Sequence, residues 1–513
     1  KVVWSKVKHA YVVVSELAKS HTKSASGKAA KAVLATAVGI GFLMGGYAAD
    51  AADTATGSGN GVAYGTGSNA PKAENVAIGK DATISYSGGV GMPSTGDIVI
   101  GNKARTNNYI DQGGGIAIGS NSFVENMTGG LERSFDFNQA GYKTLPLIGP
   151  YGLPKDPTKM MTGVAIGQNT YARSGSVMLG THNYKGALGD VTVDSANAKS
   201  HNMLPFATAL GANSYSHGLF SSVTGAYSII SSNYDGSDSS AASKNFGATI
   251  TGSLNSIESA TSSSNYSGVA NSIVGTANRT ANSNGSLIFG AGNEITNSIT
   301  NISAPSGNST SAKDLADKLR TAVNSSNSGG ATLAIGGGNK ADYTQKTSII
   351  GVNNTVTGTG NRPSTYNFIT GFKNDVENVE HVSVIGSNNI IKGSATDPVK
   401  NVVVVGDNRT VNEHADGTVV IGSHDAATAR SYNTTNAANM VLIGTNANVQ
   451  HSGGVQQWSG GHVAIGNNSY IENYVNQGGS IAVGQNSHVQ NMTGSTEATF
   501  IMNQYETKTE TDT

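Results

Sequence analysis

A short apolar run that ends in glycine recurs along most of this chain. The closest copies, such as those ending at Gly65 and Gly79 or at Gly371 and Gly386, are about fourteen to sixteen residues apart. A brief run rich in Val and Ile and closed by glycine is typical of a buried strand, and its recurrence predicts a solenoid. The closing glycines are Gly65, Gly79, Gly101, Gly119, Gly167, Gly180, Gly211, Gly225, Gly252, Gly275, Gly290, Gly336, Gly351, Gly371, Gly386, Gly406, Gly422, Gly444, Gly466 and Gly484.

The pattern inside each run predicts that the chain self-associates. The residue two before the glycine is apolar in every copy, and its two neighbours are apolar in most copies. Successive strand residues point to opposite faces, so both faces of these strands are apolar. One face can fill the inside of a coil, whereas the other needs a second surface, which a partner chain supplies most simply. This argument predicts an oligomer without giving the number of chains.

Asparagine recurs two or three residues after the closing glycine. Glycine admits a left-handed backbone and asparagine tolerates it, so the pair predicts one tight turn in each coil. Stacked asparagines are also expected to form amide ladders along the axis. The asparagines concerned are Asn121, Asn169, Asn183, Asn213, Asn293, Asn339, Asn353, Asn374, Asn388, Asn408, Asn446, Asn468 and Asn486.

Composition agrees with a thin, regular core and argues against nucleic acid as a partner. The chain has 67 glycines among 513 residues, and aromatic residues make up only 6% of it. Such a chain can build a core from small β-branched residues repeated many times. Only 13% of residues are charged and the net charge is −1, which cannot neutralise a phosphate backbone. The absence of cysteine fits an exported protein.

The first 52 residues have the features of a secretory signal. The stretch 1–31 is basic, and an apolar run follows at 32–44. Small residues then include Ala49-Asp50-Ala51, which has the A-x-A cleavage pattern and predicts cleavage within 49–52. The alternative is a membrane-spanning helix, but the apolar run is short and rich in glycine.

Two parts of the sequence resemble the trimeric autotransporter adhesins of type V secretion. The segment 2–24, VVWSKVKHAYVVVSELAKSHTKS, resembles the extended signal peptide region of large autotransporters. The VAIG unit and its polar turn, from Gly61 to about Asn491, resemble the YadA-like head repeat. That resemblance implies a homotrimer of left-handed parallel β-rolls without catalytic activity. The sequence departs from the repeat at 222–225, 249–252 and 368–371, where threonine precedes the glycine.

The expected organisation is an extended signal peptide at 1–52 and head β-roll segments at 53–139 and 163–504. A Pro-rich loop insertion at 140–162 separates the two, because four prolines cannot lie in a central strand. The segment 505–513 is expected to begin a further part of the protein. Residues 97–139 also match 462–504, with Gly101 and Gly119 of the first copy corresponding to Gly466 and Gly484.

A single short helix is expected in the widest gap of the second head segment, at about 311–323. Leu315 and Leu319 fall at helical spacing, and Ser311 is a plausible cap. We expect this helix to project from the roll, where an insertion could vary the contacts of the head or serve only as surface decoration. The fold class is therefore all-β: a left-handed, trimeric parallel β-roll solenoid with one short helical insertion and Pro-rich loop insertions.

No residue pattern predicts catalysis, a cofactor or a metal. The sequence has no G-x-x-x-x-G-K-[ST], G-x-S-x-G or H-E-x-x-H motif, so no catalytic, cofactor-binding or metal-ligating residues are assigned. His182, His381, His424 and His462 lie near turns and are expected to be exposed to solvent. Alternatives are a solenoid enzyme, such as a tailspike-like glycosidase or a hexapeptide acyltransferase, and a non-adhesive surface-layer or ice-binding solenoid.

The resemblance implies the head of a cell-surface adhesin in a bacterium with an outer membrane. Its expected partners are two further copies of the chain and a host matrix protein, a host cell surface or other bacteria. Stacked strands about 4.8 Å apart would make a head on the order of 100 Å long. The sequence shows no sustained heptad and no C-terminal membrane anchor, and it begins with Lys1, so we expect it to be truncated at both ends.

Overall fold

The computed structural model describes the residues 2–5, 10–13, 57–86, 96–108, 113–126, 161–183, 204–231, 244–259, 266–305, 311–425, 434–435, 437–451, 460–473 and 478–491. The chain forms two compact units, Lys1–Thr54 and Ala55–Thr513. In the first unit, β1 (Val2–Ser5) pairs antiparallel with β2 (Ala10–Val13). The expected cleavage site at 49–52, the segment 505–513 and all but the last two residues of the insertion at 140–162 lie outside the described residues.

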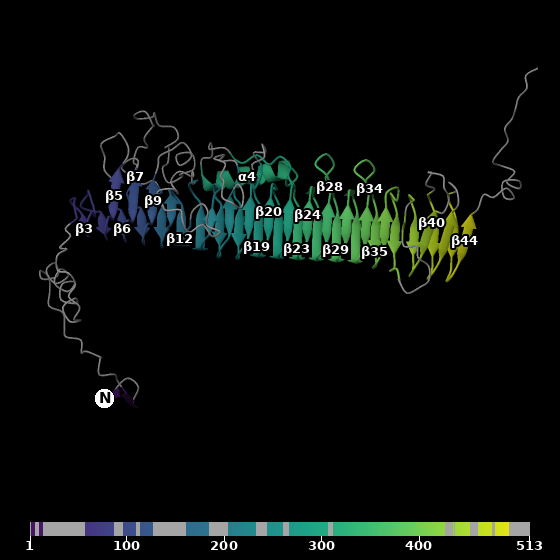
Figure 1. Cartoon of the computed structure of the whole chain (residues 1–513), viewed down its shortest axis with the longest axis horizontal. Coiled ribbons are helices and arrows are strands. Elements are labelled where there is room, and N and C mark those ends of the chain that lie inside the picture. Colours follow the sequence, from purple (N-terminus) through teal and green to yellow (C-terminus); the bar gives the residue numbers. More distant parts are fainter. Residues whose placement is uncertain are drawn as a thin grey trace, which may run out of the picture. The chain divides into compact units, whose positions relative to one another are not determined.

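In the second unit, the apolar runs form one parallel sheet, called the first sheet here (Figure 1). Within the described residues it has twenty strands, and each pairs with the equivalent strand of the next coil in an open row from β3 to β43. The strands are β3 (Val62–Tyr64), β4 (Val76–Ile78), β6 (Ile98–Ile100), β8 (Ile116–Ile118), β10 (Val164–Ile166), β12 (Val177–Thr181), β13 (Thr208–Ala212), β15 (Ser222–Thr224), β17 (Thr249–Thr251), β19 (Ser272–Thr276), β21 (Leu287–Ala291), β23 (Leu333–Gly337), β26 (Ser348–Val352), β29 (Phe368–Phe372), β32 (Ser383–Ser387), β35 (Val403–Val405), β37 (Val419–Ile421), β39 (Val441–Ile443), β41 (Val463–Ile465) and β43 (Ile481–Val483).

A second strand in most coils builds the second sheet, which consists of three parallel stretches along the roll. The first stretch is β5 (Thr83–Tyr86), β7 (Arg105–Asn108), β9 (Phe123–Asn126) and β11 (Tyr171–Arg173). The middle stretch is β14 (Tyr215–Ser216), β16 (Ile229–Ser231), β18 (Ser256–Glu258), β20 (Arg279–Ala281), β22 (Glu294–Thr296), β24 (Lys340–Asp342), β27 (Thr355–Thr357), β30 (Asp375–Glu377), β33 (Ile390–Lys392), β36 (Thr410–Asn412) and β38 (Thr434–Thr435). The last is β40 (Asn448–His451), β42 (Tyr470–Asn473) and β44 (His488–Asn491).

Four successive coils have a short third strand. These strands are β25 (Thr344–Gln345), β28 (Ser364–Thr365), β31 (Val379–Glu380) and β34 (Val399–Lys400), and they form the parallel third sheet. The structure thus confirms the all-β class and the parallel β-roll. The three runs in which threonine precedes the glycine, in β15, β17 and β29, keep the register of the first sheet.

The core is a column of small apolar side chains inside the coils. The middle residues of first-sheet strands, such as Val384 and Val404, are fully buried, and they meet second-sheet residues such as Ile391 and Val411. Burial of each Val or Ile side chain contributes about 1.5–3 kcal/mol relative to exposure. The residues that flank the buried one point outward and are half-buried or exposed, as Ser383 and Ile385 are in β32.

The closing glycines stack directly on one another along the roll. Gly371 and Gly386 have φ angles of 133° and 144°, in a region that L-residues with a side chain rarely adopt. A Cβ atom on Gly371 would overlap the carbonyl oxygen of Gly386, and one on Gly386 would overlap that of Gly406. The repeat therefore requires glycine for two reasons, backbone angle and close approach of the next coil.

Asparagines three residues after the glycine form a buried ladder, which confirms the predicted stacking of amides. In six successive pairs, the later residue donates its backbone N–H and its Nδ2 to the Oδ1 of the earlier one at 2.9–3.1 Å. Each Nδ2 also donates to the glycine carbonyl of the next coil, as in Asn374 to Gly386 at 2.8 Å. The ladder is Asn255, Asn278, Asn293, Asn339, Asn354, Asn374 and Asn389. Of these, only Asn293, Asn339 and Asn374 were in the predicted set.

Arg409 occupies the ladder position after Asn389 and ends the row. It is 2% exposed, and its backbone N–H donates to the Oδ1 of Asn389 at 2.9 Å. Its guanidinium donates to the carbonyl oxygens of Gly422, Gly444 and Ala447 at 2.6–3.0 Å, and so spans two further coils. Burial lowers the pKa of Arg409 to about 10, so the group stays charged at neutral pH.

The helical insertion is α4 (Ala312–Ser325), and it lies along the roll (Figure 1). Ser311 caps it by accepting the N–H of Asp314 at 3.1 Å, as the sequence indicated. The expectation that this helix projects from the roll is wrong, because Leu315 is buried in a second apolar cluster with roll residues that include Phe246 and Ile302. Among the described residues, no helix combines the length and the apolar character needed to cross a bilayer.

Candidate functional site

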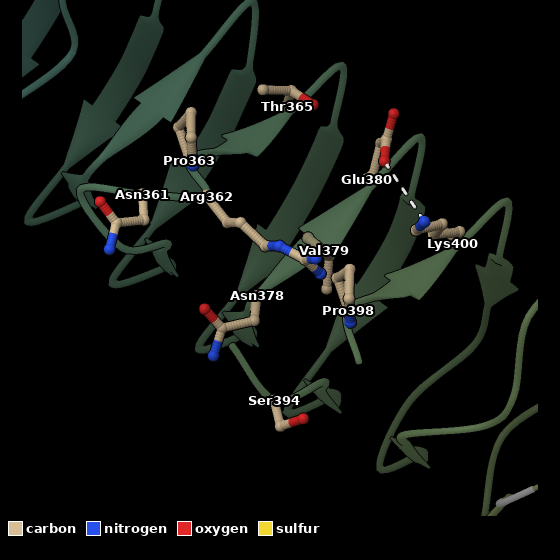
Figure 2. A pocket seen from close by; sticks show the side chains of 10 residues that line it. All are labelled: Asn361, Arg362, Pro363, Thr365, Asn378, Val379, Glu380, Ser394, Pro398 and Lys400. Carbon is tan, nitrogen blue, oxygen red and sulfur yellow. Dashed lines mark ion pairs between the residues drawn. The ribbon is translucent and has the colours of Figure 1, made fainter. Parts of the chain in front are cut away.

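A polar groove lies on the side of the roll where coils of two sizes alternate. The coil from Gly351 to Gly371 and the coil from Gly386 to Gly406 are each 20 residues long, whereas the coil between them, from Gly371 to Gly386, has 15. The extra residues of the two long coils form projecting turns at 358–363 and 393–398, called the first loop and the second loop. The short coil between them leaves a groove of about 340 Å³ (Figure 2).

Hydrogen bonds at the base of each loop fix its position. The N–H of Gly358 donates to the carbonyl of Asp342 at 2.9 Å, and the N–H of Gly393 donates to that of Glu377 at 2.9 Å. The first loop is closed by reciprocal backbone bonds between Thr359 and Arg362 at 2.9 and 3.1 Å. The groove walls are therefore ordered parts of the coil.

Two basic side chains and one carboxylate give the groove a positive balance. Arg362 reaches from the first loop across the floor toward the second, where its Nη1 donates to the carbonyl of Thr396 at 3.2 Å (Figure 2). Lys400 and Glu380 lie on the neighbouring strands β34 and β31, and their charged atoms are 4.0 Å apart. At that separation, with both side chains about two-fifths exposed, the pair is weak.

Asn378 lies in the floor of the groove with an acceptor that is not used. The residue is 8% exposed, and its Nδ2 donates to the carbonyl of Gly393 at 3.2 Å. Its buried Oδ1 accepts no hydrogen bond from any described residue. A buried acceptor without a partner destabilises the protein by about 1–3 kcal/mol, and such an atom at a binding surface is a candidate ligand contact. Val379 and the rings of Pro363 and Pro398 supply the apolar part of the lining.

Three side chains of types that commonly bind metals lie together on the far side of the second loop. Oxygen and nitrogen atoms of Asp397, Glu413 and His414 all lie within 4.8 Å of one another, although no metal ligands were assigned from the sequence. The Nδ1 of His414 is 2.8 Å from a carboxylate oxygen of Asp397. This direct contact between His414 and Asp397 accounts for the proximity of the three side chains, so we assign no ion to the group.

The outer faces of the two main sheets differ sharply in chemistry. On the first sheet, outward side chains include Phe289, Ile385 and Ile421, which are 42%, 47% and 42% exposed. This apolar face is interrupted near the middle of the roll by serine and threonine at 222, 224, 249 and 251. The second sheet instead presents rows of ion pairs between coils. Arg279, for example, lies 2.8 Å from Glu258 and 2.7 Å from Glu294, and these hydrogen bonds raise its pKa.

The four histidines predicted to be exposed have different environments. His381 is exposed and stacks on the ring of Tyr366, with centroids 4.6 Å apart. His182 and His424 are half-buried, and burial followed by the charge of Arg409 lowers the pKa of His424. The prediction is wrong for His462, which is fully buried.

The burial of His462 follows from the internal duplication. Its Nδ1 accepts the N–H of Ser480 at 3.2 Å, and its Nε2 lies 2.7 Å from the Nδ2 of Asn473. At the equivalent position of the first copy, Asp97 accepts a backbone N–H at 2.9 Å and the Nδ2 of Asn108 at 3.0 Å. His462 therefore replaces an acceptor inside the coil. Comparing the two copies residue by residue could have placed it there.

The groove residues were not found from the sequence, although a signal for them was present. Alternation of 15- and 20-residue coils between Gly336 and Gly406 places two insertions on the same side, two coils apart. The repeat of strand and glycine does not by itself bring 358–363 and 393–398 together, because each insertion lies within a single coil. No sequence pattern indicated that Asn378 would lie between them with a free acceptor.

Comparison with known proteins identifies the N-terminal segment. Residues 1–44 match the family described as Extended Signal Peptide of Type V secretion system. A search of curated proteins finds no match to the chain. The chain thus carries an export signal of type V secretion at its N-terminus, followed by a long parallel β-roll, and this route directs it to the cell envelope.

Proposed function

We propose that the chain is the head of a trimeric autotransporter adhesin, displayed at the bacterial surface and attaching to host matrix, host cells or other bacteria. One combination carries the proposal: a type V export signal at 1–44 precedes a parallel β-roll whose first sheet is apolar on its outer face. The proposal assigns no reaction, cofactor or metal to the chain.

The outer face of the first sheet supports self-association. Large apolar side chains recur along it at both ends of the roll, for example Val62, Tyr64, Val403, Ile421 and Ile481. Soluble monomers rarely expose so many large apolar side chains on one face, and a second copy of the same face would cover them. The number three comes from the resemblance to the YadA-like head.

The other sides of the roll remain for attachment. The second sheet carries inter-coil ion pairs on its outer face, and the polar groove lies beside the third sheet. In a trimer, each such feature is present three times on one rigid body. Several weak contacts made together then give an avidity well above that of one contact.

The assembly is tested by sedimentation of the secreted chain without residues 1–52, which is expected to have the mass of three copies. Ile385→Glu combined with Ile421→Glu places charges on the apolar face and is expected to produce monomers. Asn412→Glu, on the second sheet, is the control and is expected to stay trimeric.

Adhesion is tested with the same proteins on immobilised matrix proteins, cultured host cells and partner bacteria. The wild type and Asn412→Glu are expected to attach, and the monomeric variant is expected to lose most attachment because it loses multivalency. A stable wild-type monomer contradicts the trimer. A trimer that attaches to none of the three surfaces contradicts the adhesin and favours a non-adhesive surface solenoid.

A further inference from the structure

We propose that the polar groove binds a glycan that carries a carboxylate. The inference extends the proposed adhesive function by naming the ligand class of this groove. It rests on three properties of the groove: cationic groups with unused hydrogen-bond donors, a buried acceptor without a donor, and an apolar lining that includes two proline rings.

The cationic groups select an acidic ligand. One N–H of the Arg362 guanidinium is used by Thr396, and its other N–H groups have no partner among the described residues. A planar guanidinium with adjacent free donors matches the two oxygens of a carboxylate. Lys400 lies in the same groove and is only weakly paired with Glu380, so it adds a second positive charge.

The buried acceptor selects a ligand with hydroxyl groups. The Oδ1 of Asn378 lacks a donor, while its Nδ2 is held by the carbonyl of Gly393. Exchanging the two amide atoms would set the Oδ1 against that carbonyl oxygen, so the free atom is the acceptor. A sugar hydroxyl can donate to this oxygen once a small turn of the side chain exposes it, whereas sulfate and simple carboxylates have no O–H to donate. Glu380 offers a second acceptor at the edge of the same floor.

The dimensions and edges of the groove favour a sugar over a peptide. Its loops are two coils apart, or about 10 Å between backbones, which is too narrow for an α-helix with its side chains. An extended peptide would need a free strand edge, but β31 already pairs with β28 and with β34. The rings of Pro363 and Pro398 and the side chain of Val379 instead offer surfaces for the C–H faces of a sugar.

The experiment measures binding of the full secreted chain to immobilised glycans that end in glucuronic acid, N-acetylneuraminic acid, sulfated galactose or unmodified galactose. We expect binding to the two carboxylated glycans and at least tenfold weaker binding to unmodified galactose. Equal binding to the sulfated glycan would show that the groove recognises any anion on a sugar and would overturn the carboxylate assignment.

Three variants assign binding to the groove. Arg362→Gln is expected to lower affinity for carboxylated glycans at least tenfold. Asn378→Gly removes the free acceptor, keeps a residue that tolerates the observed φ of 50°, and is expected to lower affinity severalfold. Arg320→Gln removes an exposed arginine of α4 that is paired with Asp317, and it is expected to leave binding unchanged.

The results separate this inference from the proposed function. If the wild type attaches to cells but binds no acidic glycan, the groove assignment is overturned and the adhesin stands. If it binds acidic glycans without attaching to any cell or matrix, the groove assignment stands and the adhesin does not. Equal losses in Arg362→Gln and Arg320→Gln, or displacement of the glycan by a polyglutamate peptide at the same concentration, would also overturn the assignment.

Discussion

At the scale of single residues, each repeat is shaped by contacts with the next coil. The closing glycine is required because the following glycine's carbonyl occupies the space where a Cβ would be. The asparagine ladder satisfies backbone carbonyls of the turns that would otherwise be buried without donors. Arg409 continues that role with three donors where the ladder ends.

Replacement of a stacked glycine is therefore expected to be severe. Gly371→Ala combines a φ of 133° with an overlap onto the carbonyl of Gly386, and should destabilise the roll by on the order of 4 kcal/mol. Denaturant unfolding measures the change. Gly360→Ala is the matched control, because this loop glycine has no positive φ and its Cβ would meet only the ring of Tyr343 at 3.4 Å. Similar stabilities of the two variants would contradict the stacking argument.

At the scale of elements, strands and the helix were predictable to different degrees. Each closing glycine in the sequence marks a first-sheet strand, because a period imposed by coil stacking is visible without any tertiary information. The cap at Ser311 and the spacing of Leu315 and Leu319 placed α4 for the same local reason. Its docking was not predictable, because the apolar cluster that buries Leu315 gathers residues from several coils.

The docked helix provides a prediction at this scale. Leu315→Ala removes the buried anchor of α4 and should weaken its attachment by about 2–3 kcal/mol, while the coils beneath keep their own ladders. Hydrogen exchange of the α4 amides should then become faster, with little change in the first sheet. Lys313→Ala is the control, since that side chain is 86% exposed. Unchanged protection of α4 in Leu315→Ala would mean that the helix is held by other contacts.

At the scale of the whole roll, stability and function are distributed differently along the axis. Each coil contacts mainly its two neighbours, so the roll is close to one-dimensional, and coils contribute to stability largely as independent units. The polar groove lies where a coil of 15 residues stands between two coils of 20 residues. The sequence predicted the regular part because every coil repeats it. The groove was missed because it depends on the order of coil lengths, which no single repeat contains.

This order of coils can be changed while the first loop and the second loop are both kept. Deletion of residues 372–386 removes the whole 15-residue coil, joins Gly371 to Ser387, and leaves the asparagine ladder to continue from Asn354 to Asn389. The roll should stay folded and become shorter by about 4.8 Å, one strand spacing.

The same deletion makes the two loops direct neighbours, closes the groove and removes Asn378, so binding of carboxylated glycans should be lost. Small-angle X-ray scattering measures the length of the roll, and circular dichroism shows whether it stays folded. The glycan assay measures binding in the groove. Deletion of residues 373–386, one residue fewer, is the control. It leaves a coil with one extra residue, so the buried side chains of its second strand would face solvent. The unfolding temperature should therefore fall clearly. If the whole-coil deletion unfolds as readily as this control, coils are not independent units.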